Sequence, residues 1–157
     1  KPAEWGSDCI LVIDSLSRLC DAAYQWQFQL AGPKFDGRAV YGNAQQHVEK
    51  TLALLTSPGF RTNVIVIAHV LYQDQPDGTK KGFPQGVGQA LSPKIPQYFP
   101  AYALAEKKGD KRILRTTSTP LIDLANSKPF EMAKELPLET GLATFFETIR
   151  GPLNRNL

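Results

Sequence analysis

The chain has 157 residues, of which 42% are hydrophobic and 21% are charged, and its formal net charge is +3. This composition is typical of one globular domain with a sizeable core, and it argues against a disordered or fibrous chain. The mildly basic charge permits a polyanionic partner but does not require one.

The cysteines and the apolar runs indicate the compartment. Cys9 lies in an apolar run and Cys20 in a predicted helix, and neither belongs to a Cys-x-x-Cys or Cys/His cluster. The sequence therefore indicates neither a disulfide framework nor a zinc site. The longest apolar runs, residues 9–13 and 63–70, are far shorter than the roughly 20 residues that cross a bilayer, and no signal peptide opens the chain. We therefore expect a cytoplasmic protein with no membrane partner.

The first predicted strand is the aliphatic run Cys9–Ile13, which is followed directly by the carboxylate of Asp14. A continuous apolar run of this length is typical of a strand that is buried on both faces of a parallel sheet. From Ser15 the apolar spacing becomes helical and continues until Gly32-Pro33 breaks it. The residues that fall on one side of this helix are Leu16, Leu19, Ala23, Trp26 and Leu30.

A loop is predicted for Gly32 to Gly42, because this segment contains several glycines and a proline. Asn43 is the predicted N-cap of a second helix, with Gln46 as its capping-box partner. The apolar face of that helix is formed by Val48, Leu52 and Leu55, and the helix is expected to end at Ser57-Pro58-Gly59.

The second predicted strand, Asn63–Ala68, is also continuous and apolar, and it ends at the polar residue His69. A long loop is predicted for Leu71 to Pro100, which is dense in Gly, Pro, Gln and Lys. Loops of this length in compact domains usually have a function.

The C-terminal third predicts a β-hairpin followed by a last helix. Residues 102–108 and 111–117 alternate around a turn at Gly109-Asp110, which suits an antiparallel extension of the sheet. Pro137 is expected in the first turn of the last helix, and residues 151–157 are expected to form a flexible tail. The apolar face of that helix comprises Leu142, Phe145, Phe146 and Ile149.

This order of elements predicts an α/β fold built from a βαβ unit. In such folds ligands bind outside the carboxyl ends of the parallel strands. Asp14 and His69 each follow one of the two predicted strands, so both are candidate site residues.

Residues 9–16, Cys-Ile-Leu-Val-Ile-Asp-Ser-Leu, resemble the Walker B strand of RecA-like P-loop ATPases. The downstream order of loop, helix, apolar strand with a polar end, long loop and hairpin is similar as well. The sequence of residues 88–99, Gly-Gln-Ala-Leu-Ser-Pro-Lys-Ile-Pro-Gln-Tyr-Phe, is similar to that of phage nucleotide-binding proteins of this group. The resemblance covers residues 5–150. It implies that residues 1–150 form a partial RecA-like P-loop NTPase core with a mostly parallel sheet, a C-terminal antiparallel hairpin and missing N-terminal strands.

The resemblance implies ATP and Mg²⁺ as cofactors. A Walker B carboxylate holds magnesium, usually through water, because this hard cation prefers oxygen ligands. Asp14 matches that carboxylate, and Ser15 is its polar neighbour in the cofactor site. The alternative is that Asp14 only caps the helix that follows it.

His69 corresponds to the polar residue that senses the γ-phosphate and signals to the adjoining loop. RecA itself has a glutamine at this place, so histidine is a departure from the family pattern. An imidazole can donate a hydrogen bond to a phosphate and titrates near neutral pH. The alternative is a histidine whose bonds are satisfied at the edge of the sheet.

The two predicted loops correspond to the segments with which RecA-like proteins contact single-stranded DNA. Their basic residues suit phosphates, and their aromatic residues, Phe35, Tyr41, Tyr72 and Phe83, suit base stacking. The alternative is that these are solvated loop charges beside aromatic rings that pack inward. The predicted DNA-binding residues are Lys34, Arg38, Tyr72, Lys80, Lys81 and Lys94.

RecA-like ATPases complete their site across a subunit interface, which implies a homo-oligomer here. A neighbouring Lys or Arg stabilises the charge that develops during phosphoryl transfer. Arg115 and Lys94 are the candidates by position, and the alternative is that both are ordinary surface cations.

The phosphate-binding motif Gly-x-x-x-x-Gly-Lys-Ser/Thr does not occur in the 157 residues. Either the complete protein has an upstream half that carries it, as the absence of an initial Met favours, or the chain is a degenerate derivative. We expect the complete protein to hydrolyse ATP on single-stranded DNA in phage recombination, annealing or replication, in the host bacterial cytoplasm, and this chain alone to be inactive. The alternative is a non-catalytic module that contacts DNA or a virion or replisome partner.

Overall fold

The computed structural model describes residues 5–33 and 36–150 of a small α/β protein. Residues 1–4, Lys34, Phe35 and the expected tail 151–157 lie outside the described residues. Within the described ranges, every helix is too short or too polar to span a bilayer. The elements in chain order are β1 (Ile10–Asp14), α1 (Leu16–Ala31), α2 (Gly37–Leu55), β2 (Asn63–Ile67), β3 (Val70–Asp74), β4 (Lys80–Pro84), α3 (Gly88–Leu91), the 3-10 helix η2 (Ser92–Tyr98), β5 (Leu104–Lys108), β6 (Lys111–Arg115), β7 (Glu135–Pro137) and α4 (Leu138–Arg150).

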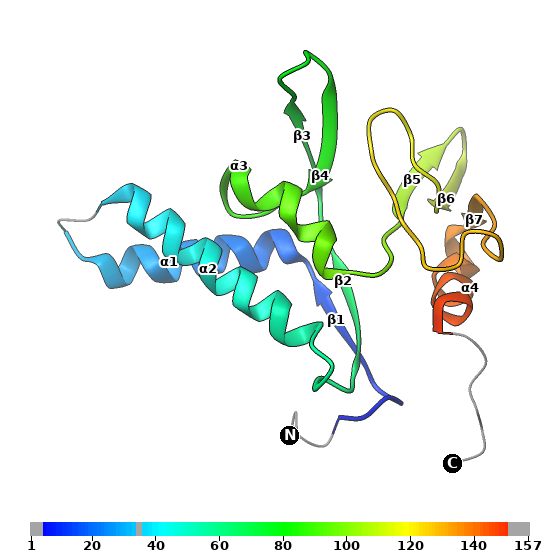
Figure 1. Ribbon diagram of the computed structural model, residues 1–157, viewed down its shortest axis with the longest axis horizontal. Coiled ribbons are helices and arrows are strands. Elements are labelled where there is room, and N and C mark those ends of the chain that lie inside the picture. The colour runs from blue at the N-terminus through cyan, green and yellow to red at the C-terminus, as the bar shows by residue number, and fades with distance from the viewer. Residues whose placement is uncertain (1–4, 34–35, 151–157) are drawn as a thin grey trace.

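The two predicted apolar strands are β1 and β2, and they are parallel neighbours (Figure 1). Their register runs from Ile10 opposite Asn63 to Asp14 opposite Ile67. One face of this pair packs on the helices through Val66, but Ile10 and Val12 are each 51% exposed on the other face. The prediction that β1 is buried on both faces is therefore wrong for the described residues, because no described element covers its second face.

The helix α1 confirms the predicted helical segment, and it ends at Gly32 with a φ of 69°. The helix α2 begins seven residues earlier than predicted. Asp36, not Asn43, is its N-cap, and its Oδ1 accepts a hydrogen bond from the Arg38 N–H at 2.9 Å. Most of the predicted loop 32–42 is therefore helical. The buried positions of α2, spaced four residues apart, are Val40, Ala44, Val48 and Leu52.

The predicted long loop 71–100 is mostly regular structure. It contains the hairpin β3–β4, whose turn places Gly78 at a φ of 80°, followed by α3 and η2. The prediction failed because each of these elements is short and because Gly or Pro interrupts β4, α3 and η2, so no period develops in the sequence. This segment is held in place by tertiary packing, since Val87, Leu91 and Ile95 insert into the core against α1 and α2.

The predicted hairpin exists as β5 and β6, with Gly109 in its turn at a φ of 61°. It does not extend the parallel sheet, contrary to the prediction. The free edge of β6 pairs with β7 instead, and in the described residues β1–β2 is the one parallel pair among three small sheets. The expected mostly parallel sheet is therefore not found. Pro137 closes β7, and α4 begins one residue later.

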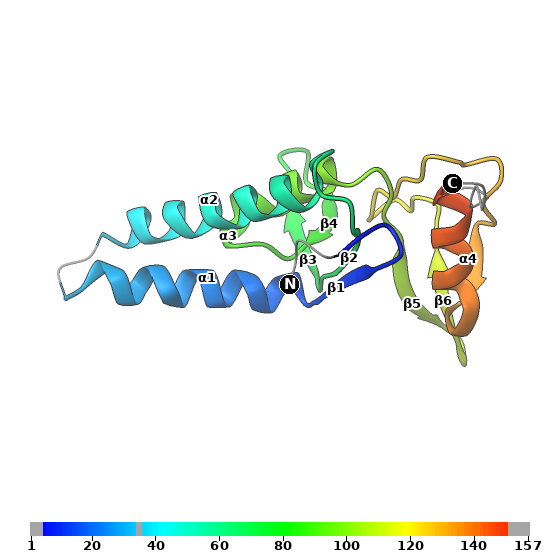
Figure 2. The ribbon, with the colours of Figure 1, turned by 90° about the horizontal axis from the view of Figure 1, so that it is seen from below.

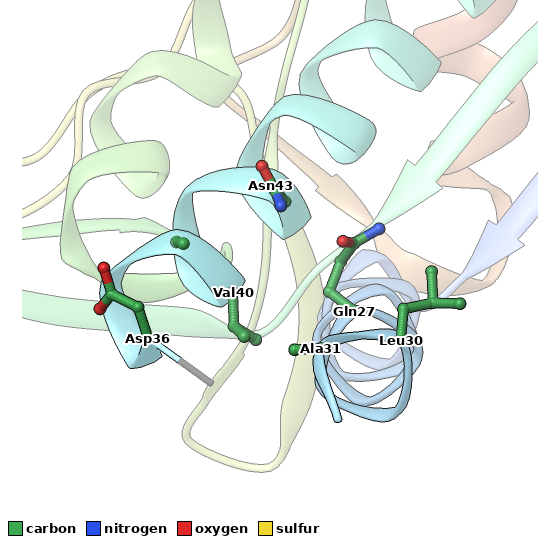
Figure 3. Close-up of a pocket in the computed structure, with 7 residues that line it drawn as sticks. Gln27, Leu30, Ala31, Asp36, Val40 and Asn43 are labelled. Atoms are coloured by element: carbon green, nitrogen blue, oxygen red, sulfur yellow. The ribbon is translucent and has the colours of Figure 1, made fainter. Parts of the chain in front are cut away.

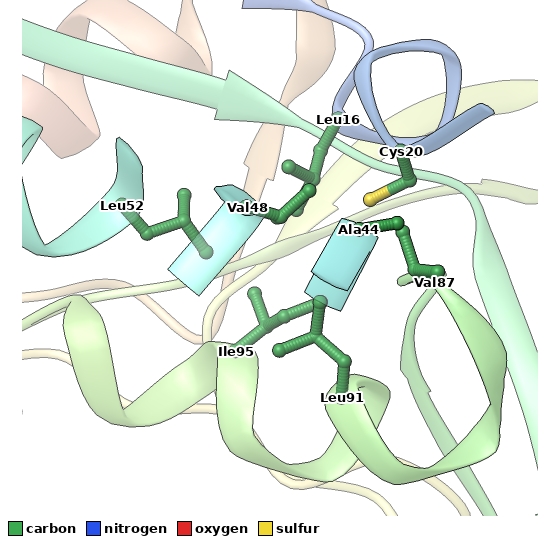
Figure 4. Close-up of a cluster of buried hydrophobic side chains, with 8 residues drawn as sticks. All are labelled: Leu16, Cys20, Ala44, Val48, Leu52, Val87, Leu91 and Ile95. Atoms are coloured by element: carbon green, nitrogen blue, oxygen red, sulfur yellow. The ribbon is translucent and has the colours of Figure 1, made fainter. Parts of the chain in front are cut away.

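The buried side chains form two clusters, one in residues 5–98 and one in residues 101–150. We call these parts the N-terminal region and the C-terminal region. In Figure 2 the hairpin of α1 and α2 extends to one end, and the C-terminal region occupies the other. The first cluster, drawn in Figure 4, comprises Leu16, Cys20, Ala44, Val48, Leu52, Val87, Leu91 and Ile95. The second comprises Leu114, Met132, Leu136 and Phe145.

The two regions are joined at the β3–β4 hairpin. The backbone N–H of Gly82 donates to the carbonyl oxygen of Leu121 at 2.7 Å, and Lys81 contacts Asp123 at 2.8 Å. Gly82 is buried at this junction, and the nearest atoms around it belong to Ile122 and Val70.

Candidate functional site

Asp14 and His69 lie at the same end of the β1–β2 pair, where the carboxyl ends of both strands are found. Asp14 is the last residue of β1, its register partner is Ile67, and His69 follows two residues after that partner. Both side chains are exposed, and neither makes a hydrogen bond or ion pair with another described residue. Carboxyl ends of adjacent parallel strands are the usual place for a ligand in α/β proteins. The predicted pair of residues is therefore brought together at a strand end that is open to solvent.

Ser15, rather than Asp14, caps α1. Its buried Oγ accepts a hydrogen bond from the Arg18 N–H at 3.3 Å. The peptide bond between Asp14 and Ser15 is cis. Because the cap is provided by Ser15, the alternative that the Asp14 carboxylate serves only as a helix cap is wrong. Asp14 therefore keeps its oxygens available for another partner.

The backbone of His69 bridges two further elements. Its N–H donates to Ser17 Oγ, which lies in the first turn of α1, at 3.2 Å. Its carbonyl oxygen accepts a hydrogen bond from the Gln85 N–H at 2.8 Å. The edge that carries Asp14 is thus tied through His69 to the loop at residues 85–88.

Asp14 is the carboxylate at this strand end that could hold a metal ion. In residues 5–33 and 36–150 there is no group of three or more His, Cys, Asp or Glu side chains arranged to hold a metal ion. A magnesium ion does not require such a group, because it retains several of its waters and is often held by one or two carboxylates and a phosphate. The donor set therefore fits Mg²⁺ better than a cation that needs an all-protein cage.

The predicted DNA-binding residues are distributed over α2, the β3–β4 hairpin and η2, and Lys34 lies outside the described residues. Three of the lysines form ion pairs: Lys80 with Asp74 at 3.8 Å, Lys81 with Asp123 at 2.8 Å, and Lys94 with Glu49 at 3.4 Å.

The other two predicted DNA-binding residues, Arg38 and Tyr72, are also exposed. The Arg38 side chain has no ionic partner among the described residues. Tyr72 is 52% exposed, with its ring beside Gly82. The β3–β4 hairpin, which holds Tyr72 and two of the lysines, is therefore the densest part of the predicted DNA surface.

Arg115 lies within the C-terminal sheet. Its guanidinium contacts Glu106 at 2.6 Å and Glu135 at 3.3 Å, and its side chain is only 21% exposed. A hydrogen bond from Lys108, together with the charges of Lys108 and Arg115, lowers the pKa of the Glu135 carboxyl. In this arrangement Arg115 holds β5, β6 and β7 together.

Two small hollows were not predicted from the sequence. One, of about 240 Å³, lies near the tip of the α1–α2 hairpin, where Gln27, Val40 and Asn43 line it (Figure 3). The other, of about 220 Å³, lies between α1, the start of α2 and the loop at residues 85–88. The glycines of Gln85-Gly-Val-Gly88 were the one available signal, and they were interpreted only as loop residues. The lining of the second hollow comprises Cys20, Asp21, Tyr24, Tyr41, Gln85, Gly86, Val87 and Gly88.

No family model, no curated protein and no solved structure matches this chain. Function is therefore inferred from the residues and their arrangement.

Proposed function

We propose that this chain carries the magnesium-binding strand and the DNA-binding surface of a RecA-like ATPase that acts on single-stranded DNA. The observation that carries the proposal is the position of Asp14 and His69 at adjacent carboxyl ends of a parallel pair. The resemblance of residues 9–16 to a Walker B strand supports the same assignment. The ATPase activity belongs to the full-length protein, including a phosphate-binding loop that these 157 residues do not contain.

Asp14 is the residue that would hold the magnesium of the bound nucleotide. Its carboxylate is exposed, has no cationic partner in the described structure and is not used by the helix cap. When bound, the ion neutralises charge on the β- and γ-phosphates. The task of Asp14 is to fix the position of the ion's water shell against the end of β1.

His69 is placed to connect the nucleotide to the DNA-binding surface. Its imidazole is exposed beside Asp14 and can donate a hydrogen bond to a phosphate oxygen. Its backbone is bonded to Ser17 and Gln85, so a shift of His69 moves the loop at residues 85–88. This loop follows β4 directly, and a response to nucleotide therefore reaches the β3–β4 hairpin.

Single-stranded DNA binds the β3–β4 hairpin in this proposal. The ion pair of Lys80 with Asp74 is exposed, and such pairs contribute little stability. A phosphate can therefore replace Asp74 as the partner of Lys80 at small cost. Tyr72 offers the half-exposed ring on which an unpaired base stacks.

The first experiment measures ATP hydrolysis by the full-length protein with Mg²⁺ and single-stranded DNA. We expect hydrolysis that depends on DNA and that is lost in Asp14→Ala without a change in the thermal unfolding midpoint, because the Asp14 side chain has no hydrogen-bond or ionic partner among the described residues. Absence of hydrolysis in the wild type, together with nucleotide binding that Asp14→Ala leaves unchanged, would refute the proposal.

The second experiment measures the salt dependence of single-strand affinity for Lys80→Ala plus Lys81→Ala. Each lost phosphate contact reduces the slope of log affinity against log salt by about 0.7, so the expected reduction is about 1.4. Lys107→Ala plus Lys111→Ala removes the same charge from the β5–β6 hairpin and should leave the slope unchanged. Equal slopes for both double variants would refute the DNA assignment of the β3–β4 hairpin.

A second candidate function is a non-catalytic assembly module. The exposed apolar side chains of Ile10, Val12 and Ile67 on the β1–β2 pair favour it, because such faces are usually covered. This candidate predicts that nucleotide does not change the affinity for the partner. The ATPase predicts that nucleotide does change it.

A further inference from the structure

The hollow of about 220 Å³ beside the loop at residues 85–88 has the form of a small binding site. The most buried of its lining residues is Cys20, which is only 2% exposed. Its rim is formed by the exposed residues Asp21, Tyr41 and Gly88. Pockets for drug-sized ligands measure roughly 300–1,000 Å³, so this hollow suits a smaller planar group.

The hollow is formed by backbone that is already held in place. Gly86 donates its N–H to Ser92 Oγ at 2.9 Å, and the carbonyl oxygen of Val87 accepts a hydrogen bond from Gln45 Nε2 at 2.8 Å. With the bond from Gln85 to His69, the loop is fixed to three other segments. A ligand therefore meets a preformed wall and does not have to order the loop.

The walls suit an aromatic ring. The rings of Tyr24 and Tyr41 lie with centroids 4.5 Å apart at an interplanar angle of 36°, and Tyr41 remains 46% exposed. Gly88 lines the hollow without a Cβ atom at a point where a Cβ would lie 3.9 Å from Tyr41 Cδ1, so a flat group can approach the backbone closely there. Stacking of a base on a tyrosine ring is favourable for every base, so these walls alone do not select one.

Asp21 is the residue that would distinguish one base from the others. It lies one helical turn before Tyr24, and its only partner in the described structure is Arg18, at 3.6 Å between two exposed side chains. A carboxylate accepts two parallel hydrogen bonds. On its Watson–Crick edge guanine presents two adjacent donors, N1–H and N2–H, whereas the other DNA bases place an acceptor beside each donor. The geometry points to this hollow as a binding site for an unpaired guanine base, stacked at Tyr41 and held by the Asp21 carboxylate.

The inference rests on the proposed function insofar as the base belongs to single-stranded DNA. The hollow and the β1–β2 edge share the loop at residues 85–88, because Gln85 is bonded to His69. Guanine in the hollow and nucleotide at Asp14 therefore act on the same segment. The same chemistry also fits the base of a free guanine nucleotide, and the experiment separates the two sources.

The test compares the affinity of the full 157-residue chain for oligothymidines that carry one central guanine or one central adenine. We expect about tenfold tighter binding of the guanine oligomer, which is within the range of a good bidentate contact to a base. Asp21→Asn removes this preference while binding to plain oligothymidine is retained. Asp110→Asn, the same change in the exposed β5–β6 turn, keeps the preference. An equal affinity for the two oligomers, or a preference that survives Asp21→Asn, overturns the inference.

The second arm uses free dGMP and dAMP, observed by saturation-transfer NMR. One outcome is that the chain binds no oligomer but gives a dGMP signal that Asp21→Asn abolishes. This outcome would support the guanine site and refute the proposed DNA function. If the chain prefers the guanine oligomer and Asp21→Asn abolishes that preference, both the guanine site and the proposed DNA function are supported. Tyr41→Phe preserves the ring and should keep either signal, whereas Tyr41→Ala should weaken it at least fivefold. Indifference of both signals to Tyr41→Ala counts against the stacking role.

Discussion

One group of polar residues in the N-terminal region contrasts with one in the C-terminal region. In the N-terminal region Asp14 and His69 stand exposed at a strand edge, without ionic partners among the described residues. In the C-terminal region Arg115 lies between Glu106 and Glu135, where its charge joins three strands. Unpaired polar groups at a strand end are available for ligands, and paired groups within a sheet contribute mainly to folding. The contrast is therefore between a strand end whose polar groups are unpaired and a sheet whose charges are paired.

The largest effect is expected from truncating a side chain of the core that positions the carboxyl ends of β1 and β2. Leu52 is fully buried in the N-terminal cluster, so Leu52→Ala should lower the free energy of unfolding by about 3 kcal/mol. Leu54, on the same helix, is 63% exposed, and Leu54→Ala should change it by less than about 0.5 kcal/mol. Urea denaturation followed by circular dichroism measures both. Equal losses would contradict the described packing of α2.

The next effect tests the junction between the two regions. A Cβ atom at Gly82 would lie 2.9 Å from side-chain atoms of Ile122 and Val70. Gly82→Ala should therefore destabilise the protein by about 2 kcal/mol and separate the hairpin from the segment near Leu121. Gly42→Ala is the matched control, because it meets nothing within 4 Å in α2 and should stabilise the protein by about 0.5 kcal/mol. Thermal unfolding that ranks the two variants in the reverse order would show that the regions are not joined at Gly82.

A smaller effect is expected from Arg115→Ala. The variant leaves two partly solvated carboxylates without their shared cation, so we expect a loss of about 1 kcal/mol in unfolding free energy. Arg112, on the same strand, is exposed and has no ionic partner among the described residues, and Arg112→Ala should cost less. If Arg115→Ala instead leaves stability unchanged and abolishes ATP hydrolysis by the full-length oligomer, Arg115 acts across the subunit interface as the family resemblance implies.

The smallest effect is the pH dependence of the C-terminal sheet. The folded-state pKa of Glu135 lies below its ordinary value of 4.5, so its stabilising contribution is present above that pH. The contribution is lost as the pH falls through the lowered pKa. Between about pH 6 and about pH 3, the thermal midpoint of Glu135→Gln should fall less steeply than that of the wild type. Parallel curves would mean that Lys108 and Arg115 do not hold Glu135 in its charged form.

The sequence predicted the elements whose signals are local. The runs before Asp14 and His69 are continuous and apolar, and both became strands of a parallel pair. The start of α2 was missed because Asp36 is as good an N-cap as Asn43, and nothing local distinguishes them. The pairing of β6 with β7 was missed because it joins residues that are about twenty positions apart.

The candidate site was predicted in part for the same reason. A residue that directly follows a strand is visible in the sequence, as Asp14 and His69 were. The ion pairs of Lys81 and Arg115 depend on partners that only folding brings near. The cap at Ser15 is local, since its partner Arg18 lies three residues on, and it was overlooked. The hollow at Asp21 and Tyr41 combines three distant segments, so no local pattern could have indicated it.

The most direct test of the central claim compares the two ends of β1. Asp8 precedes the strand and Asp14 ends it, and both carboxylates are exposed without a partner among the described residues. Magnesium-dependent ATP affinity of the full-length protein should fall at least tenfold in Asp14→Asn, as expected when the carboxylate that orients the ion is lost, and should not change in Asp8→Asn. Equal affinities for the two variants, with both proteins folded, would contradict the assignment of nucleotide chemistry to the carboxyl end of β1.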